Sequence, residues 1–199
     1  MAGILFAAFV VFLVLGIPIG FVLALSSVAA IFYADYPLTV LSQRFFASLD
    51  SFPYMAIPLF MLAGSIMAHG GITRRIIDFA LSLVGSIRGA LAHVVAVSGV
   101  MLGGISGSGV ADAAALGSIM VPEMKRRNYD TGFSAALVAA SGSIGLIIPP
   151  SIALIIYGVT TNTSIGDLFL AGIIPGVAIG LLFLVYSYFV AKKRNYPVE

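Results

Sequence analysis

The stretch GGISGSGVAD, residues 103–112, places four glycines, two serines and one acid inside an apolar part of the chain. No charged residue lies between Arg88 and Asp112. A second irregular stretch, GLIIPPS at residues 145–151, carries two consecutive prolines in another uncharged region. Glycine destabilises the interior of a helix, and proline lacks the N–H of a helical hydrogen bond. The two stretches therefore predict two interruptions of helical structure in apolar surroundings.

The charge distribution around these stretches predicts an all-α polytopic membrane protein. Of 199 residues, 60% are hydrophobic and 9% are charged, and the mean hydropathy is +1.12. A soluble domain carries roughly 25% charged residues. The net charge of +2 is too small and too scattered to indicate a nucleic-acid partner. Runs longer than the ~20 residues that a helix needs to cross a bilayer precede Asp35 and separate Asp50 from Arg74, Arg88 from Asp112, Asp130 from Asp167, and Asp167 from Lys192.

The first uncharged run, residues 2–34, is too long for one ordinary span. Gly16-Ile17-Pro18 interrupts it near the middle, and proline breaks a helical ladder. The sequence allows two short tilted helices, about 2–16 and 18–34, or one long kinked helix.

The next segments combine one predicted span with two amphipathic segments. Residues 36–52 mix aromatic residues with Arg44 and Asp50, which suits an interfacial helix or loop. Residues 53–70 form a span. In residues 71–89 the apolar positions recur at helical spacing opposite charged ones, which predicts a helix lying along the membrane surface.

The two irregular stretches lie within the segments that follow. Apolar arms 89–105 and 109–124 flank the first stretch and predict a helical hairpin, either re-entrant or made of two tilted full crossings. Residues 130–160 form a span broken at the double proline. Residues 168–191 form the final span, which ends in three basic residues.

Orientation follows from the positions of the basic residues. Cytoplasmic segments of membrane proteins carry an excess of Lys and Arg. One side of the predicted topology collects Arg74, Arg75 and Arg88, the cluster 125–127, and the cluster 192–194. The sequence therefore predicts a multi-pass membrane protein with a cytoplasmic C-terminus.

The chemistry available at both breaks is that of uncharged oxygen ligands. Non-helical backbone persists at membrane depth only where protein buries it or where it lines a watery cavity. Such oxygens suit Na⁺, and the N-termini of the half-helices after each break suit a substrate carboxylate. The competing interpretation is that the small residues only let helices pack closely. The candidate ligands are the hydroxyls of Ser106, Ser108, Ser141, Ser143 and Ser151 and the carbonyls of Gly145, Ile148 and Pro150.

Asp112 is the only acid in the hairpin apart from Glu123 at its end. An ionisable residue within a membrane segment is a functional candidate by default, and at this position it is also placed to cap the second arm. His69 and His93 are isolated, so packing or interfacial roles are expected for them and no metal site other than one for Na⁺.

Two other classes of function compete with transport. Gly104-Ile105-Ser106-Gly107 fits the G-x-S-G nucleophile pattern of rhomboid-type intramembrane proteases, but no histidine follows His93 to act as the base. A non-transporting scaffold or assembly subunit predicts intact helices, not paired breaks. We therefore expect no enzymatic activity and no catalytic residue.

With both breaks in view, the chain resembles the large, DctM-like membrane subunit of TRAP (tripartite ATP-independent periplasmic) transporters. The resemblance, which implies the cytoplasmic membrane of a bacterium or archaeon, is carried by five stretches in order that together span nearly the whole chain. They are GIPIGFVLAL (16–25), FPYMAIPLFMLAGSIM (52–67), GGISGSGVADAAALGSIM (103–120), ASGSIGLIIPPSIALIIYG (140–158) and SIGDLFLAGIIPG (164–176).

The resemblance implies one inverted-repeat unit of an elevator-type carrier, with about five crossings, an interfacial arm helix, a re-entrant hairpin and a broken helix. Scaffold helices would occupy residues 1–70 and the arm residues 71–88. Residues 89–160 would form the transport part, with the hairpin at 89–124 and the broken helix at 130–160. Residues 161–199 would hold a final scaffold-type helix and a basic cytoplasmic tail.

The resemblance also implies Na⁺-driven uptake of organic acids, of the C4-dicarboxylate or sialic-acid type. A periplasmic binding protein would deliver the substrate, and a small membrane subunit would brace the scaffold within the lipid bilayer. The substrate carboxylate is expected at the hydroxyls of Ser106, Ser108 and Ser151. The implied Na⁺ site consists of Ser106, Gly107, Ser108, Gly145, Ile148 and Pro150.

The chain departs from the family in one respect, since the second inverted repeat that the resemblance calls for is absent from residues 1–199. An odd number of crossings is what an inverted duplication requires, which favours two helices within residues 2–34. The expectation is a fragment or one piece of a split subunit, unable to transport alone, with a self-pairing half as the alternative.

Overall fold

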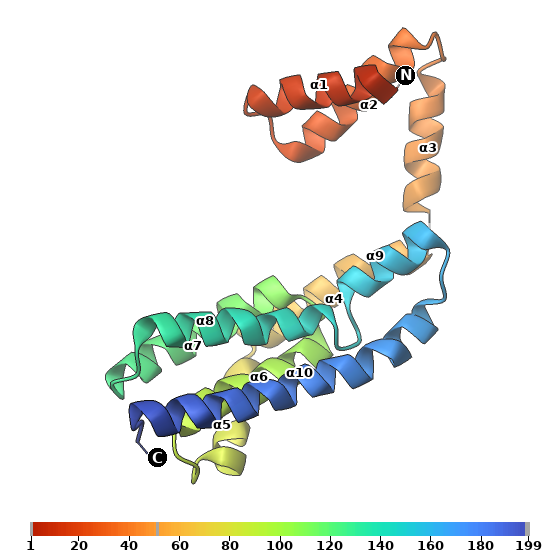
Figure 1. The fold of residues 1–199 in the computed structure, drawn as a ribbon. Helices are drawn as coiled ribbons and strands as arrows, with labels where there is room; N and C mark the ends of the chain where they lie inside the picture. The colour runs from red at the N-terminus through yellow and green to blue at the C-terminus, as the bar shows by residue number, and fades with distance from the viewer. Residues whose placement is uncertain (1, 51, 198–199) are drawn as a thin grey trace. The chain divides into compact units, whose positions relative to one another are not determined.

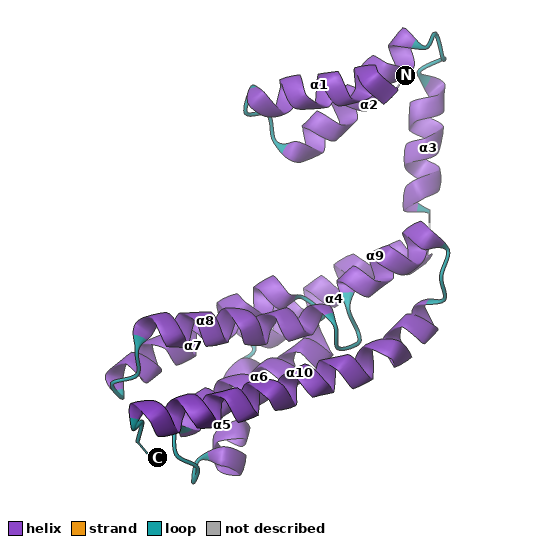
Figure 2. Ribbon diagram, viewed as in Figure 1, coloured by secondary structure: helices purple, strands orange, loops and turns teal. Residues whose placement is uncertain are grey.

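The computed structural model describes residues 2–50 and 52–197, and helices account for nearly all of the secondary structure there (Figure 2). No β-strand occurs in these residues, so the predicted all-α fold is confirmed for them. Figure 1 gives the order of the elements. They are α1 (Ala2–Val14), α2 (Ile19–Tyr33), α3 (Thr39–Leu49), α4 (Phe52–His69), α5 (Ile72–Val84), α6 (Ala90–Ser106), α7 (Gly109–Arg126), α8 (Thr131–Ser143), the short 3₁₀ helix η1 (Ile144–Leu146), α9 (Ile152–Thr161) and α10 (Ile165–Arg194).

The chain divides into two compact units, Met1–Phe52 and Pro53–Glu199. In the first unit, α1 and α2 pack against each other across the turn at Gly16-Ile17-Pro18. Gly16 has a φ of 76°, a left-handed conformation that glycine adopts without steric cost. The interpretation as two helices is therefore confirmed, and the single kinked helix is wrong. The segment after α2 contains α3, and its position at the membrane interface stays a prediction.

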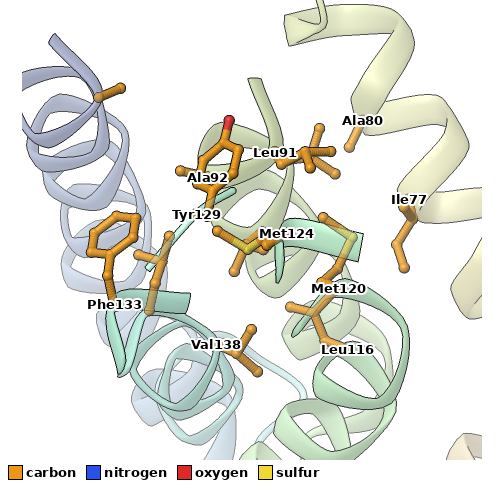
Figure 3. Packing of buried hydrophobic residues seen from close by; sticks show 14 of the residues in the cluster. Ile77, Ala80, Leu91, Ala92, Leu116, Met120, Met124, Tyr129, Phe133 and Val138 are labelled. Carbon is orange, nitrogen blue, oxygen red and sulfur yellow. The ribbon is translucent and has the colours of Figure 1, made fainter. Parts of the chain in front are cut away.

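In the second unit, α6 is the central helix and packs against α5, α7, α8 and α10. The buried cluster shown in Figure 3 fills the space between these helices. Helix α5 contributes a face with the spacing i, i+3, i+4 and i+7, while Arg74 and Arg75 are exposed on the other side. The predicted amphipathic helix is therefore present. Its buried residues are Thr73, Ile76, Ile77 and Ala80, whereas Phe79 and Leu83 are exposed.

Helix α10 packs along α6 and also contacts α9 and η1. A row of glycines at four-residue spacing permits the close approach: Gly172 lies against the Ile147 carbonyl, Gly176 against the Ile148 side chain, and Gly180 against Val100. The assignment of residues 161–199 to a scaffold stays a prediction.

Among the described helices, α10 is the one that is by itself long and apolar enough to cross a bilayer, and α3 with α4 reach that size when counted as one span. Five shorter helical segments are apolar but cover only 10–17 residues each. Large apolar side chains are exposed along α10, among them Leu170, Ile174 and Phe189. An apolar surface of this extent indicates a lipid environment.

Candidate functional site

The tip of the hairpin is a two-residue turn between α6 and α7. Helix α6 ends at Ser106, and Gly107 follows it with a φ of 63°, the left-handed geometry that commonly ends a helix. Ser108 then begins α7 as its N-cap, and its Oγ accepts a hydrogen bond of 3.4 Å from the Ala111 amide. The glycine-rich stretch therefore forms a tight helix–turn–helix, not a flexible loop.

The second break separates α8 from α9. Pro149 and Pro150 lack the N–H groups that a continuous helix would direct at the carbonyls of Gly145 and Leu146. The Ser151 hydroxyl replaces one of them, donating to the Leu146 carbonyl at 2.7 Å. Nothing replaces the other: among the described residues, no hydrogen bond reaches the Gly145 carbonyl, nor the carbonyls of Ile148 and Pro150.

The two breaks contact each other through their backbones. The Ile152 amide donates to the Gly107 carbonyl at 3.3 Å. A Cβ atom at Gly107 would collide with the Pro150 carbonyl oxygen, and one at Gly103 would lie 2.7 Å from the Gly145 Cα. Gly104 lies within contact distance of the Ile148 side chain. The structure therefore brings the hairpin tip together with the free carbonyls of the broken helix.

A pair of polar side chains lies beneath this crossing. Ser106 Oγ donates to Asp112 Oδ1 at 2.6 Å and accepts from the Ser108 amide at 3.1 Å. Asp112 is 3% exposed, and its Oδ2 has no hydrogen-bond partner among the described residues. Ser108, not Asp112, is the N-cap of α7. The interpretation of Asp112 as that cap is therefore wrong, and it serves instead as the acceptor for Ser106.

Three other serines considered as ligands have different roles. Ser151 is fully buried, and its Oγ accepts from the Leu154 amide at 3.3 Å while donating to Leu146. It is therefore the N-cap of α9, and its expected role in substrate binding stays a prediction. The exposed Ser143 bonds to the Ala140 carbonyl. Ser141 is fully buried against Gly99, one turn before Gly145.

A cavity of about 380 Å³ opens beside the hairpin tip. Ser106, Ser108 and Asp112 line it from the hairpin, and α4 and α5 close its other side through Gly64 and Thr73. No lysine or arginine lines the cavity in the described part of the chain. A substrate carboxylate there would meet hydroxyls, the N-terminus of α7 and His69, and no lysine or arginine.

These donors fit a small hard cation. Uncharged carbonyl and hydroxyl oxygens with one carboxylate nearby are the ligand chemistry of alkali and alkaline-earth ions. No cluster of three or more His, Cys, Asp or Glu residues suited to a transition metal occurs within residues 2–50 and 52–197. Ser106 donates its proton to a carboxylate and not to a histidine, so the nucleophile–base pair of a rhomboid-type protease is not formed.

An all-helical, lipid-exposed unit with two facing helix breaks belongs to the class of membrane transport proteins with discontinuous helices. The sequence comparisons give the family: residues 6–199 match the model of the tripartite ATP-independent periplasmic transporter, DctM component. The chain belongs to this family and is a membrane protein of the TRAP transporter permease type.

The relatives extend this result. The chain is 44% identical over 197 residues to the isethionate TRAP transporter permease protein DctMQ of Oleidesulfovibrio alaskensis, covering 98% of this chain and 31% of the relative. It is 42% identical to the sialic acid TRAP transporter large permease protein SiaM of Vibrio cholerae, covering 98% and 44%. Identity to the C4-dicarboxylate large permease protein DctM of Vibrio cholerae is 36%, covering 99% and 44%. The chain thus spans less than half the length of these relatives.

Proposed function

We propose that this chain forms one inverted-repeat unit of a sodium-coupled permease for organic acids. The relatives named above transport isethionate, sialic acid and C4-dicarboxylates according to their names, and all three are organic anions. In the complete transporter, a periplasmic binding protein delivers the acid and a small membrane subunit braces the scaffold. A second repeat supplies the other half of the substrate site.

The cation site in this proposal lies where the two breaks cross. Ser106, Gly107 and Ser108 approach it from the hairpin tip, and the carbonyls of Gly145, Ile148 and Pro150 approach it from the broken helix. The observation that carries the proposal is that these carbonyls accept no hydrogen bond from the described residues although the hairpin tip packs directly against them. Unsatisfied backbone at membrane depth is costly, and a bound cation removes that cost.

The substrate carboxylate is proposed to bind on the cavity side of the tip. Ser106 and Ser108 line the cavity, and the N-terminus of α7 carries the positive end of a helix dipole. A cation bound beside these groups adds positive charge where no lysine or arginine of the described residues lines the cavity. Cation and acid therefore bind more tightly together than apart, which is what symport requires.

The proposed transport cycle moves the hairpin and the broken helix as one body. Helix α5 serves as the arm along the membrane surface, and α10 travels with the hairpin because it packs on α6 and η1. The chain crosses the cytoplasmic membrane several times and ends on the cytoplasmic side. A scaffold or assembly subunit is the second candidate, but it needs neither the free carbonyls nor the cavity at the tip.

Replacing the tip serines tests this proposal. Ser106→Ala and Ser108→Ala each remove an oxygen from the site, so each variant should require about tenfold more Na⁺ for half-maximal uptake. The measurement is uptake of an organic acid into proteoliposomes that contain the complete transporter and its binding protein, with the Na⁺ concentration varied against choline. Ser118→Ala is the matched control, because Ser118 lies on the exposed side of α7 and bonds only to the Ala115 carbonyl.

Two outcomes would contradict the proposal. If uptake by the wild-type transporter does not depend on Na⁺, the proposed coupling to sodium is wrong. If both serine variants keep the Na⁺ dependence of the wild type, the cation site does not lie at the hairpin tip.

A further inference from the structure

Asp112 is a buried carboxylate, and residues 89–124 of the hairpin and 130–160 of the broken helix contain no lysine or arginine. It is 3% exposed. It is the only charged residue of the hairpin between Arg88 and Glu123, and residues 131–166 of the broken helix contain none. Because an uncompensated charge within a membrane protein is strongly unfavourable, a positive partner would stabilise the ionised form of this carboxyl.

The first carboxylate oxygen orients Ser106. A hydroxyl has one proton and two lone pairs. The proton of Ser106 is directed to Asp112 Oδ1 at 2.6 Å, and one lone pair accepts from the Ser108 amide at 3.1 Å. The remaining lone pair of Ser106 is therefore available to a ligand that lies away from the carboxylate.

The second carboxylate oxygen lies at the crossing of the two breaks. Oδ2 is 2.6 Å from the position that a Cβ atom of Gly145 would take. It has no hydrogen-bond partner in the described residues. Gly145 also carries a carbonyl that no donor satisfies. The unpaired acidic oxygen thus lies beside the residue whose carbonyl is free.

We propose that Asp112 is the positioning and charge-balancing residue of the cation site. Its Oδ1 fixes the orientation of the Ser106 hydroxyl, and its negative charge compensates the cation held by otherwise uncharged ligands. This inference rests on the proposed function, because it assigns to Asp112 a role toward the same cation. It differs from a purely structural role, in which the acid only interacts favourably with the N-terminal dipole of α7.

The variant Asp112→Asn separates charge from shape, because an asparagine oxygen still accepts the Ser106 proton. The complete transporter in detergent is titrated with NaCl against choline chloride, and the midpoint of thermal unfolding is recorded. Without Na⁺, the variant should unfold at or above the wild-type midpoint, since the unbalanced charge is gone. It should then need about tenfold more Na⁺ for the same stabilisation, because a charge-assisted interaction is lost. Asp167→Asn, which removes an exposed acid from the first turn of α10, should behave as wild type.

The results separate this inference from the proposed function. A wild-type transporter that Na⁺ neither stabilises nor drives contradicts the proposed function itself. Wild-type Na⁺ stabilisation that Asp112→Asn shares at the same concentrations overturns only the role of Asp112. An Asp112→Asn protein that is unfolded with and without Na⁺ also overturns it, because the carboxylate is then needed for folding whether or not a cation is bound.

Discussion

At the scale of single residues, the glycines at the crossing of the two breaks have a steric role. A Cβ atom at Gly145 would lie 2.6 Å from Asp112 Oδ2 and 3.2 Å from the Gly103 Cα. Gly145→Ala should therefore force the hairpin and the broken helix apart and lower the free energy of unfolding by about 1–3 kcal/mol. It should also weaken stabilisation by Na⁺. Thermal unfolding of the purified permease with and without Na⁺ measures both effects.

Gly166→Ala is the control for Gly145→Ala. A Cβ atom there would meet only Ser164 Oγ at 3.8 Å, an ordinary contact distance. Alanine in this exposed first turn of α10 should leave stability unchanged or raise it by about 0.4–1 kcal/mol. If both substitutions had the same effect, close packing at Gly145 would not be the cause.

The candidate site was predictable from the sequence only in part. The hydroxyls, glycines and prolines stand out because oxygen ligands and helix breakers are rare within long apolar runs. The bond between Ser106 and Asp112 was not predictable, because residues six apart on one continuous helix do not meet. The left-handed turn at Gly107 brings them together. The cap role of Ser151 was missed although a serine directly after Pro-Pro and before an apolar helix is a recognisable N-cap signal.

At the scale of elements, the fold followed from the sequence wherever a breaker or a charge marked a boundary. Gly16 and Pro18 separate α1 from α2, and the charged face of α5 identifies a surface helix. The partner of α10 was not predictable in the same way. Its central part is apolar all round, so hydrophobic periodicity specifies no packing face. The glycines at 172, 176 and 180 were the available signal, since small residues at that spacing permit close helix packing.

The ends of three helices are joined by contacts of the C-terminal segment. Arg194 at the end of α10 forms a 3.1 Å ion pair with Asp130, the N-cap of α8. Tyr196 stacks on Tyr129 with 4.1 Å between ring centroids, and its hydroxyl accepts from the Asp130 amide at 3.2 Å. The Gly89 amide before α6 donates to the Pro197 carbonyl at 2.8 Å. We name Gly89, Asp130, Arg194, Tyr196 and Pro197 the C-terminal clasp.

The C-terminal clasp should make the free energy of unfolding depend on pH in the acidic range. The Phe133 amide, and then Arg194, hold the pKa of Asp130 below its ordinary value of 3.8. A carboxyl with a depressed folded-state pKa stabilises the protein above the ordinary pKa, and this stabilisation is lost as pH falls through the folded-state pKa. Asp130→Asn should therefore reduce the difference between the unfolding midpoints at pH 6 and at about pH 3. Asp35→Asn, in the other unit, is the control. Because the Asp130 carboxylate is exposed, we expect this effect to be small. If the difference between the two midpoints were the same in Asp130→Asn as in the wild type, this charge would have no role in the pH dependence.

At the scale of the whole molecule, the second unit has two opposite ends that we assign to opposite sides of the membrane. The α7–α8 loop and the C-terminus lie at one end, and the α9–α10 connection lies at the other (Figure 1). Helix α10 has 30 residues, about 45 Å at 1.5 Å per residue, which exceeds the ~30 Å hydrocarbon core. Basic residues gather at the first end, including Lys125, Arg126 and Lys193. That end should therefore be cytoplasmic.

Single cysteines test this topology directly in a complete transporter in which every other cysteine is replaced by serine, since residues 1–199 contain no cysteine. Cysteine replaces Arg126, Thr163 or Lys193, each exposed, in the complete transporter, and intact cells or spheroplasts are treated with a membrane-impermeant maleimide. Thr163→Cys should react from outside, whereas Arg126→Cys and Lys193→Cys should react only after permeabilisation. If Arg126→Cys and Thr163→Cys reacted from the same side, α8 and α9 would not form a broken crossing. If all three positions were reversed, the crossing would hold but the orientation would be wrong. The experiment thus distinguishes an error in the predicted crossing by α8 and α9 from an error in the predicted orientation, because the orientation is predicted from the basic residues alone.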